Sequence, residues 1–208
     1  VYSEAFPFSY RHMKDGMLNL TDTKGNVYII RNGYGVTVEK KSQTSPSDTK
    51  KKTGTGNFIT AYIDHGTSPQ NASYEYLMLV RPSSKDEGRF AKKLPYTVIQ
   101  ADNQAHVVRD DITGITAYIS YGGYASAETL VAGAEPETIV MERTRDDGKV
   151  VMSVCTPDLG ITEKGYTTTQ QSQKILKKVI LKGTWSLSSP SENVDLIIED
   201  GNTVISAI

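Results

Sequence analysis

The residues best suited to chemistry lie between positions 64 and 80, where a histidine, two acids and two tyrosines occur. Histidine suits proton transfer near neutral pH because its pKa lies in that range. No nucleophile or acid partner of His65 can be recognised nearby in the sequence. We therefore favour a turn histidine whose ring bonds a neighbouring carbonyl, with Gly66 supplying backbone freedom and Pro69 stiffening the loop.

Tyr74 and Tyr76 lie two residues apart, so their side chains share one face of a strand. On an exposed face they could stack on sugar rings, but such pairs pack more often in a sandwich core, and we favour the core. Asp64, Glu75 and Glu142 could act as paired carboxylates on a glycoside. Nothing in the sequence shows that these three acids converge.

The sequence contains no pattern typical of a metal or cofactor site. His12, His65 and His106 lack the spacing of zinc ligands. The acidic pairs at 110–111 and 146–147 could bind calcium, which takes oxygen ligands. Both pairs lie in predicted hairpin turns, where aspartate is expected for backbone reasons. We therefore predict no metal and no cofactor.

Lys50, Lys51 and Lys52 are the candidates for contact with a charged polymer. Together with Lys40 and Lys41, they could attract a sulfated polysaccharide through long-range charge. The alternative is a solvated loop whose lysines serve solubility, and we favour it. The three consecutive lysines remain the candidate substrate-binding residues, and no residue is assigned a catalytic role.

The composition is that of a folded protein. Of the 208 residues, 38% are hydrophobic and 23% are charged, and the formal net charge is −1. These values argue against disorder and against a global field for nucleic acid. No apolar run approaches the roughly 18 residues of a membrane-spanning helix. The single cysteine, Cys155, has no partner for an internal disulfide, and we favour a buried structural thiol.

The chain is predicted to be all-β. Tyrosine occurs 12 times, and short runs of Val, Ile, Thr and Tyr alternate with Gly, Pro, Asn and Asp. No helix longer than two turns is expected, although a short one is predicted over residues 87–93. Strands are predicted at residues 27–30, 34–39, 58–63, 74–80, 96–101, 105–110, 114–121, 138–143, 149–154, 175–181, 194–199 and 203–205.

Turn residues predict how some of these strands pair. Asn32-Gly33 predicts a hairpin between the first two strands, and Asp146-Asp147-Gly148 predicts another. Residues 110–114 are expected to form the turn of a third. Residues 58–63 and 74–80 are expected to be antiparallel partners joined by a tight loop.

The character of the loops changes along the chain. Residues 40–57 contain almost nothing apolar and are predicted to form a long exposed loop. After residues 92–96 the hairpins become short and regular. We therefore expect two domains, residues 1–93 and residues 94–208. The chain opens at Val1 without a methionine or a signal-peptide pattern, so we expect it to be a fragment of a longer protein.

Several motifs occur in a fixed order along the chain. They are a Gly-containing turn and Tyr-containing strand (24–30), His65-Gly66 followed by Pro69, Tyr74-Glu75-Tyr76 with an apolar run to Val80, an extended segment (96–108), a strand ending in Thr-Pro-Asp (153–159) and a closing strand (179–185). Single motifs are weak, but the ordered set covers most of the chain. It resembles the β-sandwich part of the bacterial polysaccharide lyases of polysaccharide lyase family 8, and residues 71–76 are similar to those of the broad-specificity chondroitin sulfate ABC lyases.

The resemblance implies an all-β fold, in which the last part of a large antiparallel β-sandwich, a partial super-sandwich at residues 1–93, precedes a smaller C-terminal β-sandwich at 94–208. In the family, an Asn, a His, a Tyr and an Arg on an upstream α-helical toroid carry out β-elimination at a uronic acid, assisted by a Glu near the start of the β region. None of these motifs occurs here. The resemblance therefore implies no catalytic residue in this chain.

Two hypotheses follow. The first is the non-catalytic C-terminal part of a periplasmic or secreted lyase for chondroitin or dermatan sulfate. Its partners would be the upstream α-helical catalytic domain and the glycosaminoglycan substrate. The second is a stand-alone carbohydrate-binding or cell-surface β module. Neither hypothesis involves nucleic acid or a membrane span.

Overall fold

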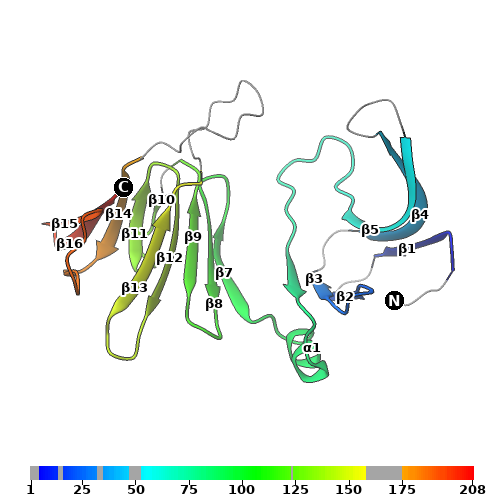
Figure 1. Cartoon of the computed structure of the whole chain (residues 1–208), viewed down its shortest axis with the longest axis horizontal. Coiled ribbons are helices and arrows are strands. Elements are labelled where there is room, and N and C mark those ends of the chain that lie inside the picture. Colours follow the sequence, from blue (N-terminus) through cyan, green and yellow to red (C-terminus); the bar gives the residue numbers. More distant parts are fainter. Residues whose placement is uncertain (1–4, 14–15, 32–34, 47–52, 123, 158–174) are drawn as a thin grey trace. The chain divides into compact units, whose positions relative to one another are not determined.

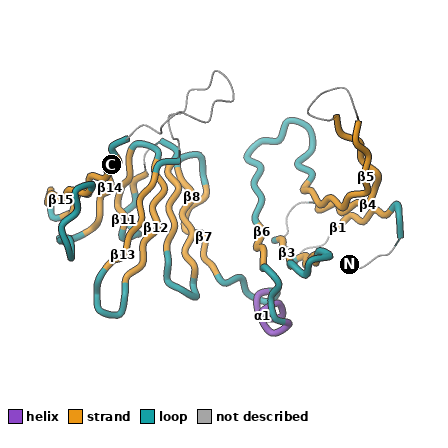
Figure 2. The backbone as a smooth tube through the Cα atoms, viewed as in Figure 1, coloured by secondary structure: helices purple, strands orange, loops and turns teal. Residues whose placement is uncertain are grey.

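The computed structural model describes residues 5–13, 16–31, 35–46, 53–122, 124–157 and 175–208. The described residues form four antiparallel sheets and one short helix, which confirms the predicted all-β class (Figures 1 and 2). No helix among them is long and apolar enough to cross a membrane. The chain divides into two compact units, Val1–Leu94 and Pro95–Ile208.

The first unit contains two three-stranded sheets that share a small core. Leu18, Ile30 and Val36 are buried together, with Leu20 and Ile63 packed against them. Because these residues come from both sheets, the unit is a β-sandwich in miniature. One sheet has the order β1 (Phe8–His12), β4 (Val36–Pro46), β5 (Thr53–Ile63), and the other has the order β2 (Leu18–Thr21), β3 (Val27–Ile30), β6 (Tyr76–Leu79).

The long β4–β5 hairpin extends beyond that core. The two strands pair over eleven residues each, from Val36 opposite Ile63 to Pro46 opposite Thr53. Strand β1 accompanies β4 only as far as Lys40. Beyond that point the described hairpin is a two-stranded ribbon of β4 and β5 (Figure 1).

The predicted loop at residues 40–57 was therefore wrong. Much of it is strand, held by cross-strand bonds between polar side chains: Ser42 donates to Asn57 at 2.8 Å, and the hydroxyls of Thr44 and Thr55 lie 3.4 Å apart. Serine, threonine and glycine pairs can form a ladder without burying a face. Residues 40–57 were predicted to be a loop because they show no alternation of apolar residues, but a ladder of polar side chains needs none.

Two predicted hairpins in this unit were also wrong. Strands β3 and β4 lie in different sheets, and so do β5 and β6. β5 pairs with β4, whereas β6 pairs with β3. Neighbours in sequence here cross between the two layers of a sandwich, which short-range turn signals do not reveal. The Asn32-Gly33 turn itself lies outside the described residues.

The helix is α1 (Ser84–Phe90), three residues earlier than predicted. Ser83 is its N-cap: its hydroxyl accepts a hydrogen bond from the Asp86 amide at 3.2 Å and donates to the Asp86 carboxylate at 2.6 Å. Asp86 and Glu87 lie in the first turn, where negative charge favours the helix dipole. The cap therefore determines where the helix starts.

The second unit contains two five-stranded sheets. Their shared core consists mainly of residues that alternate along the strands, as expected for a sandwich. One sheet has the order β13 (Val150–Cys155), β12 (Thr138–Thr144), β9 (Thr116–Ser120), β8 (Ala105–Asp110), β7 (Tyr96–Ala101). The other has the order β10 (Tyr124–Ala125), β11 (Val131–Glu135), β14 (Lys177–Lys182), β16 (Asn202–Ala207), β15 (Val194–Glu199).

The predicted hairpins of this unit are confirmed. β8 pairs with β9, and β12 pairs with β13. Trp185, which follows β14, is partly buried and packs against the core. Cys155 is exposed, so the prediction of a buried thiol was wrong. On the edge strand β13, Val154 packs against the core and the next residue therefore points outward.

The core of the second unit contains a buried polar contact. The Tyr118 side chain is 1% exposed, and its hydroxyl donates to the Glu142 carboxylate at 3.2 Å. The Tyr118 ring meets Tyr124 edge-on at 5.6 Å, and the Tyr124 hydroxyl lies 2.8 Å from that of Thr129. Burial, followed by the nearby Glu142 charge, raises the pKa of Tyr118 well above its ordinary value of 10.0.

Replacing Tyr118 with Phe should lower the free energy of unfolding of this unit by about 1–3 kcal/mol, because a buried carboxylate loses its partner. Above pH 10 the unfolded chain loses the Tyr118 proton before the folded chain does, so this group's stabilisation falls as pH rises. That alkaline component should be missing in Y118F. Urea titration followed by fluorescence of the single tryptophan, Trp185, measures both effects. Tyr121→Phe, at an exposed position in the same unit, is the matched control; equal losses in the two variants would contradict the assignment.

Candidate functional site

The three acids proposed as paired carboxylates have separate partners. Asp64 accepts a hydrogen bond from the Gly66 amide at 2.8 Å, and Glu75 forms an ion pair with Arg31 at 3.5 Å. Glu142 is buried in the second unit, where it accepts the hydrogen bond from Tyr118. Each of the three carboxylates is therefore accounted for by a partner within its own unit.

The tyrosines of this segment are on the surface rather than in the core. Tyr74 is 69% exposed and Tyr76 is 52% exposed, and their rings stack at 6.4 Å. Tyr76 is paired with the core residue Ile30 but lies on β6, the outer strand of its sheet. The predicted core position was wrong because the opposing layer leaves this edge uncovered.

His65, the histidine of the same segment, is half-buried.

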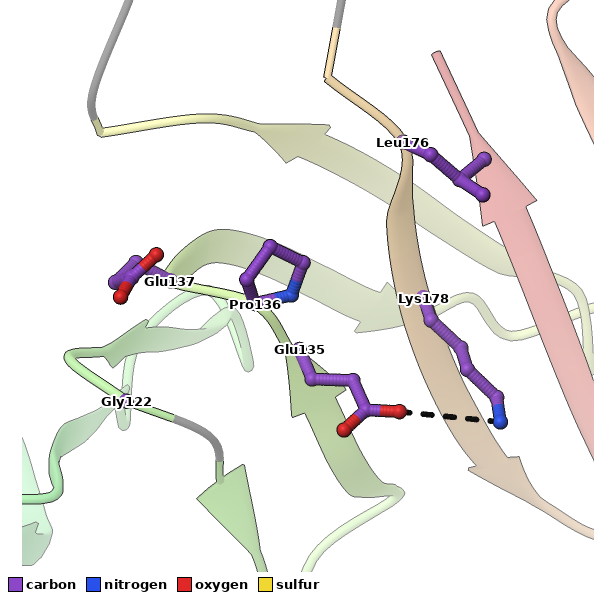
Figure 3. A pocket seen from close by; sticks show the side chains of 6 residues that line it. All are labelled: Gly122, Glu135, Pro136, Glu137, Leu176 and Lys178. Atoms are coloured by element: carbon purple, nitrogen blue, oxygen red, sulfur yellow. Dashed lines mark ion pairs between the residues drawn. The ribbon is translucent and has the colours of Figure 1, made fainter. Parts of the chain in front are cut away.

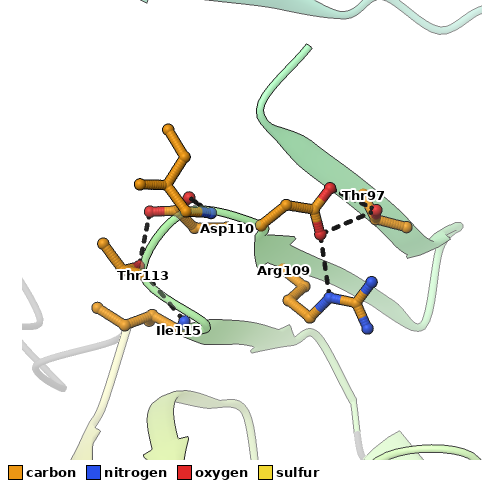
Figure 4. A network of polar contacts seen from close by, with 7 residues as sticks. Thr97, Arg109, Asp110, Thr113 and Ile115 are labelled. Atoms are coloured by element: carbon orange, nitrogen blue, oxygen red, sulfur yellow. Dashed lines mark hydrogen bonds and ion pairs between the residues drawn. The ribbon is translucent and has the colours of Figure 1, made fainter. Parts of the chain in front are cut away.

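No group of three metal-ligating side chains occurs among the described residues. Asp110 lies at the turn after β8 and bonds groups of that turn (Figure 4). Asp110 accepts hydrogen bonds from the Ile112 amide at 2.8 Å and from the Thr113 hydroxyl at 2.7 Å. Asp111 pairs with Arg109 at 3.1 Å. These bonds account for both carboxylates by backbone and ion-pair contacts, as expected for a turn.

A hollow in the second unit lies beside the start of β12. It is lined by Gly122, Glu135, Pro136, Glu137, Leu176 and Lys178, shown in Figure 3. The Lys178 ammonium lies 3.8 Å from the Glu135 carboxylate, so the two nearest opposite charges neutralise each other. An apolar leucine and proline complete the lining. The ionisable groups of this lining are therefore the Glu135–Lys178 pair and the Glu137 carboxylate.

One face of the β4–β5 hairpin combines an aromatic ring with polar groups. A hollow there is lined by Gln43, Thr44, Ser45, Gly54, Thr55, Gly56 and Phe58, which we call the hairpin hollow. The strand register places Lys41, Gln43 and Ser45 opposite Phe58, Gly56 and Gly54, so these six residues share one face. The two glycines carry no side chain there, so the Phe58 ring can lie over Gly56 and the space at Gly54 stays open.

Phe58 is the prominent group of this face. It is 55% exposed, and its ring leans over Gly56: a side-chain carbon at position 56 would lie only 2.8 Å from the ring. Tyr62, 46% exposed, lies four residues along the same strand on the same face, about 13 Å away. The sequence prediction treated Phe58 and Tyr62 only as strand formers. Their spacing of four residues was the available signal.

The charges near this face are mixed. Lys41 forms a short ion pair with Glu39 at 2.5 Å, and the hydrogen bond to Glu39 raises the pKa of Lys41. The predicted substrate-binding residues Lys50, Lys51 and Lys52 lie in the connection between the two strands, outside the described residues. They stay a prediction.

Comparison with known proteins accounts for the fold. No family model matches the chain. The chondroitin sulfate ABC endolyase of Proteus vulgaris is 28% identical over 189 residues, which cover 88% of this chain and 18% of that enzyme. The chondroitin sulfate ABC exolyase of Bacteroides thetaiotaomicron is 34% identical over 119 residues, or 55% of this chain and 11% of that enzyme. The chain is homologous to the chondroitin sulfate ABC lyases.

The motif-based recognition is therefore confirmed, and this lyase homologue spans less than a fifth of the length of these curated relatives. Solved lyases share its fold at low identity. The structure of a xanthan lyase from Paenibacillus matches 96% of this chain with a TM-score of 0.70 and 17% identity. A chondroitin AC lyase of Streptomyces coelicolor matches 93% with a TM-score of 0.59 and 15% identity.

Replacing Asp110 with Ala should destabilise the lyase homologue modestly, by roughly 0.5–1 kcal/mol, because the carboxylate is in contact with water. The hydrogen bonds from Thr113 and Ile112 lower the pKa of Asp110 below 3.8. Its stabilisation is therefore present above that pH and is lost as the pH falls through the folded-state value. Thermal unfolding between pH 2 and pH 7 measures this dependence.

Asp146→Ala is the control for this variant, since it removes an exposed turn carboxylate from another hairpin of the same unit. Millimolar calcium should leave the unfolding temperature of the lyase homologue unchanged. A calcium-dependent rise that disappears in D110A would contradict the turn assignment and indicate a cation site.

Proposed function

We propose that this chain is a non-catalytic β-sandwich part of a polysaccharide lyase that cleaves chondroitin or dermatan sulfate by β-elimination at a uronic acid. The observation that carries the proposal is the similarity to chondroitin sulfate ABC lyases, which extends over 88% of the chain but only 18% of the first relative. β-Elimination needs a base for the C5 proton and an acid for the leaving oxygen. Among the described residues, the acidic candidates Asp64 and Glu75 each have a local partner, the Gly66 amide and Arg31 respectively.

The role we propose for the chain is support. Residues 1–93 would belong to the large sandwich of the parent enzyme and residues 94–208 to its small terminal sandwich. An α-helical domain upstream in the parent would carry the catalytic residues, and the β part would hold it in position and form one side of the substrate cleft. We place the parent in the periplasm or outside the cell, where its polymeric substrate is found.

The isolated 208-residue chain should release no unsaturated uronate from chondroitin sulfate, because the proposal places the catalytic residues in the upstream domain of the parent. The product absorbs in the ultraviolet, so a continuous absorbance assay measures it. The parent protein, with its upstream sequence, should be active under the same conditions. Product formed by the isolated chain would contradict the non-catalytic role, and an inactive parent would contradict the proposed reaction.

Replacing Lys50, Lys51 and Lys52 together with Ala should weaken binding of chondroitin sulfate by the isolated chain several-fold at low salt. The expected reason is the loss of long-range attraction, which should also reduce the salt dependence of binding. The control replaces Lys85, Lys92 and Lys93, which are exposed lysines near α1, and removes the same charge. Equal weakening by both triple variants would show that only net charge matters, and the assignment of the three lysines would fail.

A further inference from the structure

We propose that the outward face of the β4–β5 hairpin, comprising the hairpin hollow with Phe58 and the neighbouring Tyr62, binds a stretch of anionic polysaccharide. The identity of the polymer rests on the proposed function, whereas the site itself rests on the geometry of the hairpin. No sequence motif identified this face.

The two aromatic rings suit the apolar faces of sugar rings. A pyranose presents C–H groups on its faces and hydroxyls around its rim, so it stacks on an exposed ring while its rim stays hydrogen-bonded. Phe58 is 55% exposed and Tyr62 46% exposed. Both rings project from one strand on one side, about 13 Å apart, which an extended oligosaccharide can bridge.

The groups around Phe58 suit the rim of a sugar. On the face that carries Phe58, the hairpin hollow contains the Gln43 amide and the Ser45 hydroxyl, with Gly54 beside them. These are donors and acceptors for hydroxyl, carboxylate and sulfate oxygens. Gln43 already donates to Thr60 at 3.3 Å, which holds its side chain on this face.

The same composition argues against a buried protein interface. The centre of a protein interface is apolar and rich in large side chains. Along the ribbon beyond Lys40, the outward face carries Phe58 as its one large apolar group among the described residues, between polar side chains and glycines. Such a surface remains hydrated when it binds, as polysaccharide contacts do.

The charge of the hairpin selects an acidic polymer. The described residues of the hairpin carry Lys40 and Lys41 against Glu39, a formal charge of +1 within a chain whose total is −1. The net charge of this described segment is therefore positive. A polymer with a carboxylate or sulfate on each repeat is attracted to it, and a neutral polymer is not.

The test is titration of the 208-residue chain with chondroitin sulfate, unsulfated hyaluronan and neutral dextran, followed by calorimetry. We expect measurable binding of the two acidic polymers and none of dextran. Phe58→Ala should weaken binding about tenfold, and Tyr62→Ala should weaken it less. Ile59→Ala is the matched control, because Ile59 is 54% exposed on the opposite face of the same strand.

Phe58→Leu separates binding from folding. Leucine retains apolar cover over Gly56 but lacks a flat ring, so F58L should keep the wild-type unfolding temperature and bind about as weakly as F58A. Phe58→Tyr should bind like the wild type. Equal effects of F58A and I59A, full binding by F58L, equal binding of dextran, or no binding by the wild type would each overturn the proposal. None of these results bears on whether the parent is a lyase, which the absorbance assay decides.

Discussion

The alternation of side chains across paired strands is the constraint on which this molecule depends. In the second unit, Val107, Tyr118 and Val140 lie opposite one another on three neighbouring strands and are almost fully buried. Residues of the other sheet, such as Val179 and Ile205, complete the same core. A slip of one residue in any of these strands would turn its core residues to water. The contact between Tyr118 and Glu142 adds a second requirement, because the buried carboxylate keeps its hydrogen bond only in this register. Packing and hydrogen bonding therefore specify the same arrangement.

In the first unit, alternating side chains are buried over only a short part of the paired strands. Its shared core is small, and strands of four residues face strands of eleven. The part of the β4–β5 hairpin beyond the core buries neither face: Phe58 and Ile59 are consecutive, point to opposite sides and are similarly exposed. An isolated two-stranded ribbon is marginal in water. The bonds of Ser42 with Asn57 and of Gln43 with Thr60, together with the Phe58 ring over Gly56, supply local support that burial does not. A ribbon maintained by polar contacts is also one whose surface is available to a hydrated ligand.

The alternation of side chains also explains which strand pairs and which buried residues could be predicted from the sequence. The hairpins of the second unit were predictable, because their strands are adjacent in sequence, alternate clearly and join through turns such as Asp146-Asp147-Gly148. The pairing in the first unit was not, because β5 and β6 are consecutive in sequence but belong to different layers. The polar ladder of β4 and β5 has no apolar period. The exposure of side chains on edge strands was also predicted incorrectly. Tyr76 lies opposite a core residue, yet it is half-exposed because it belongs to an edge strand. Local pattern gives the direction of a side chain, whereas its burial depends on which layer covers it.

The candidate site has a comparable limit. Phe58 and Tyr62 acquire their significance from a fact that only the pairing reveals: Gly54 and Gly56 share their face, so the ring stands beside a hollow rather than within a packed layer. The acids that looked suited to catalysis, Asp64 and Glu75, have local partners instead. β-Elimination at a uronic acid requires a base at the C5 proton and an acid at the leaving oxygen, both held in place by a rigid concave site. A projecting ribbon cannot provide that geometry. It can provide a line of contacts along an extended polymer, since each ring and hydroxyl acts independently and no single placement must be held to a fraction of an ångström.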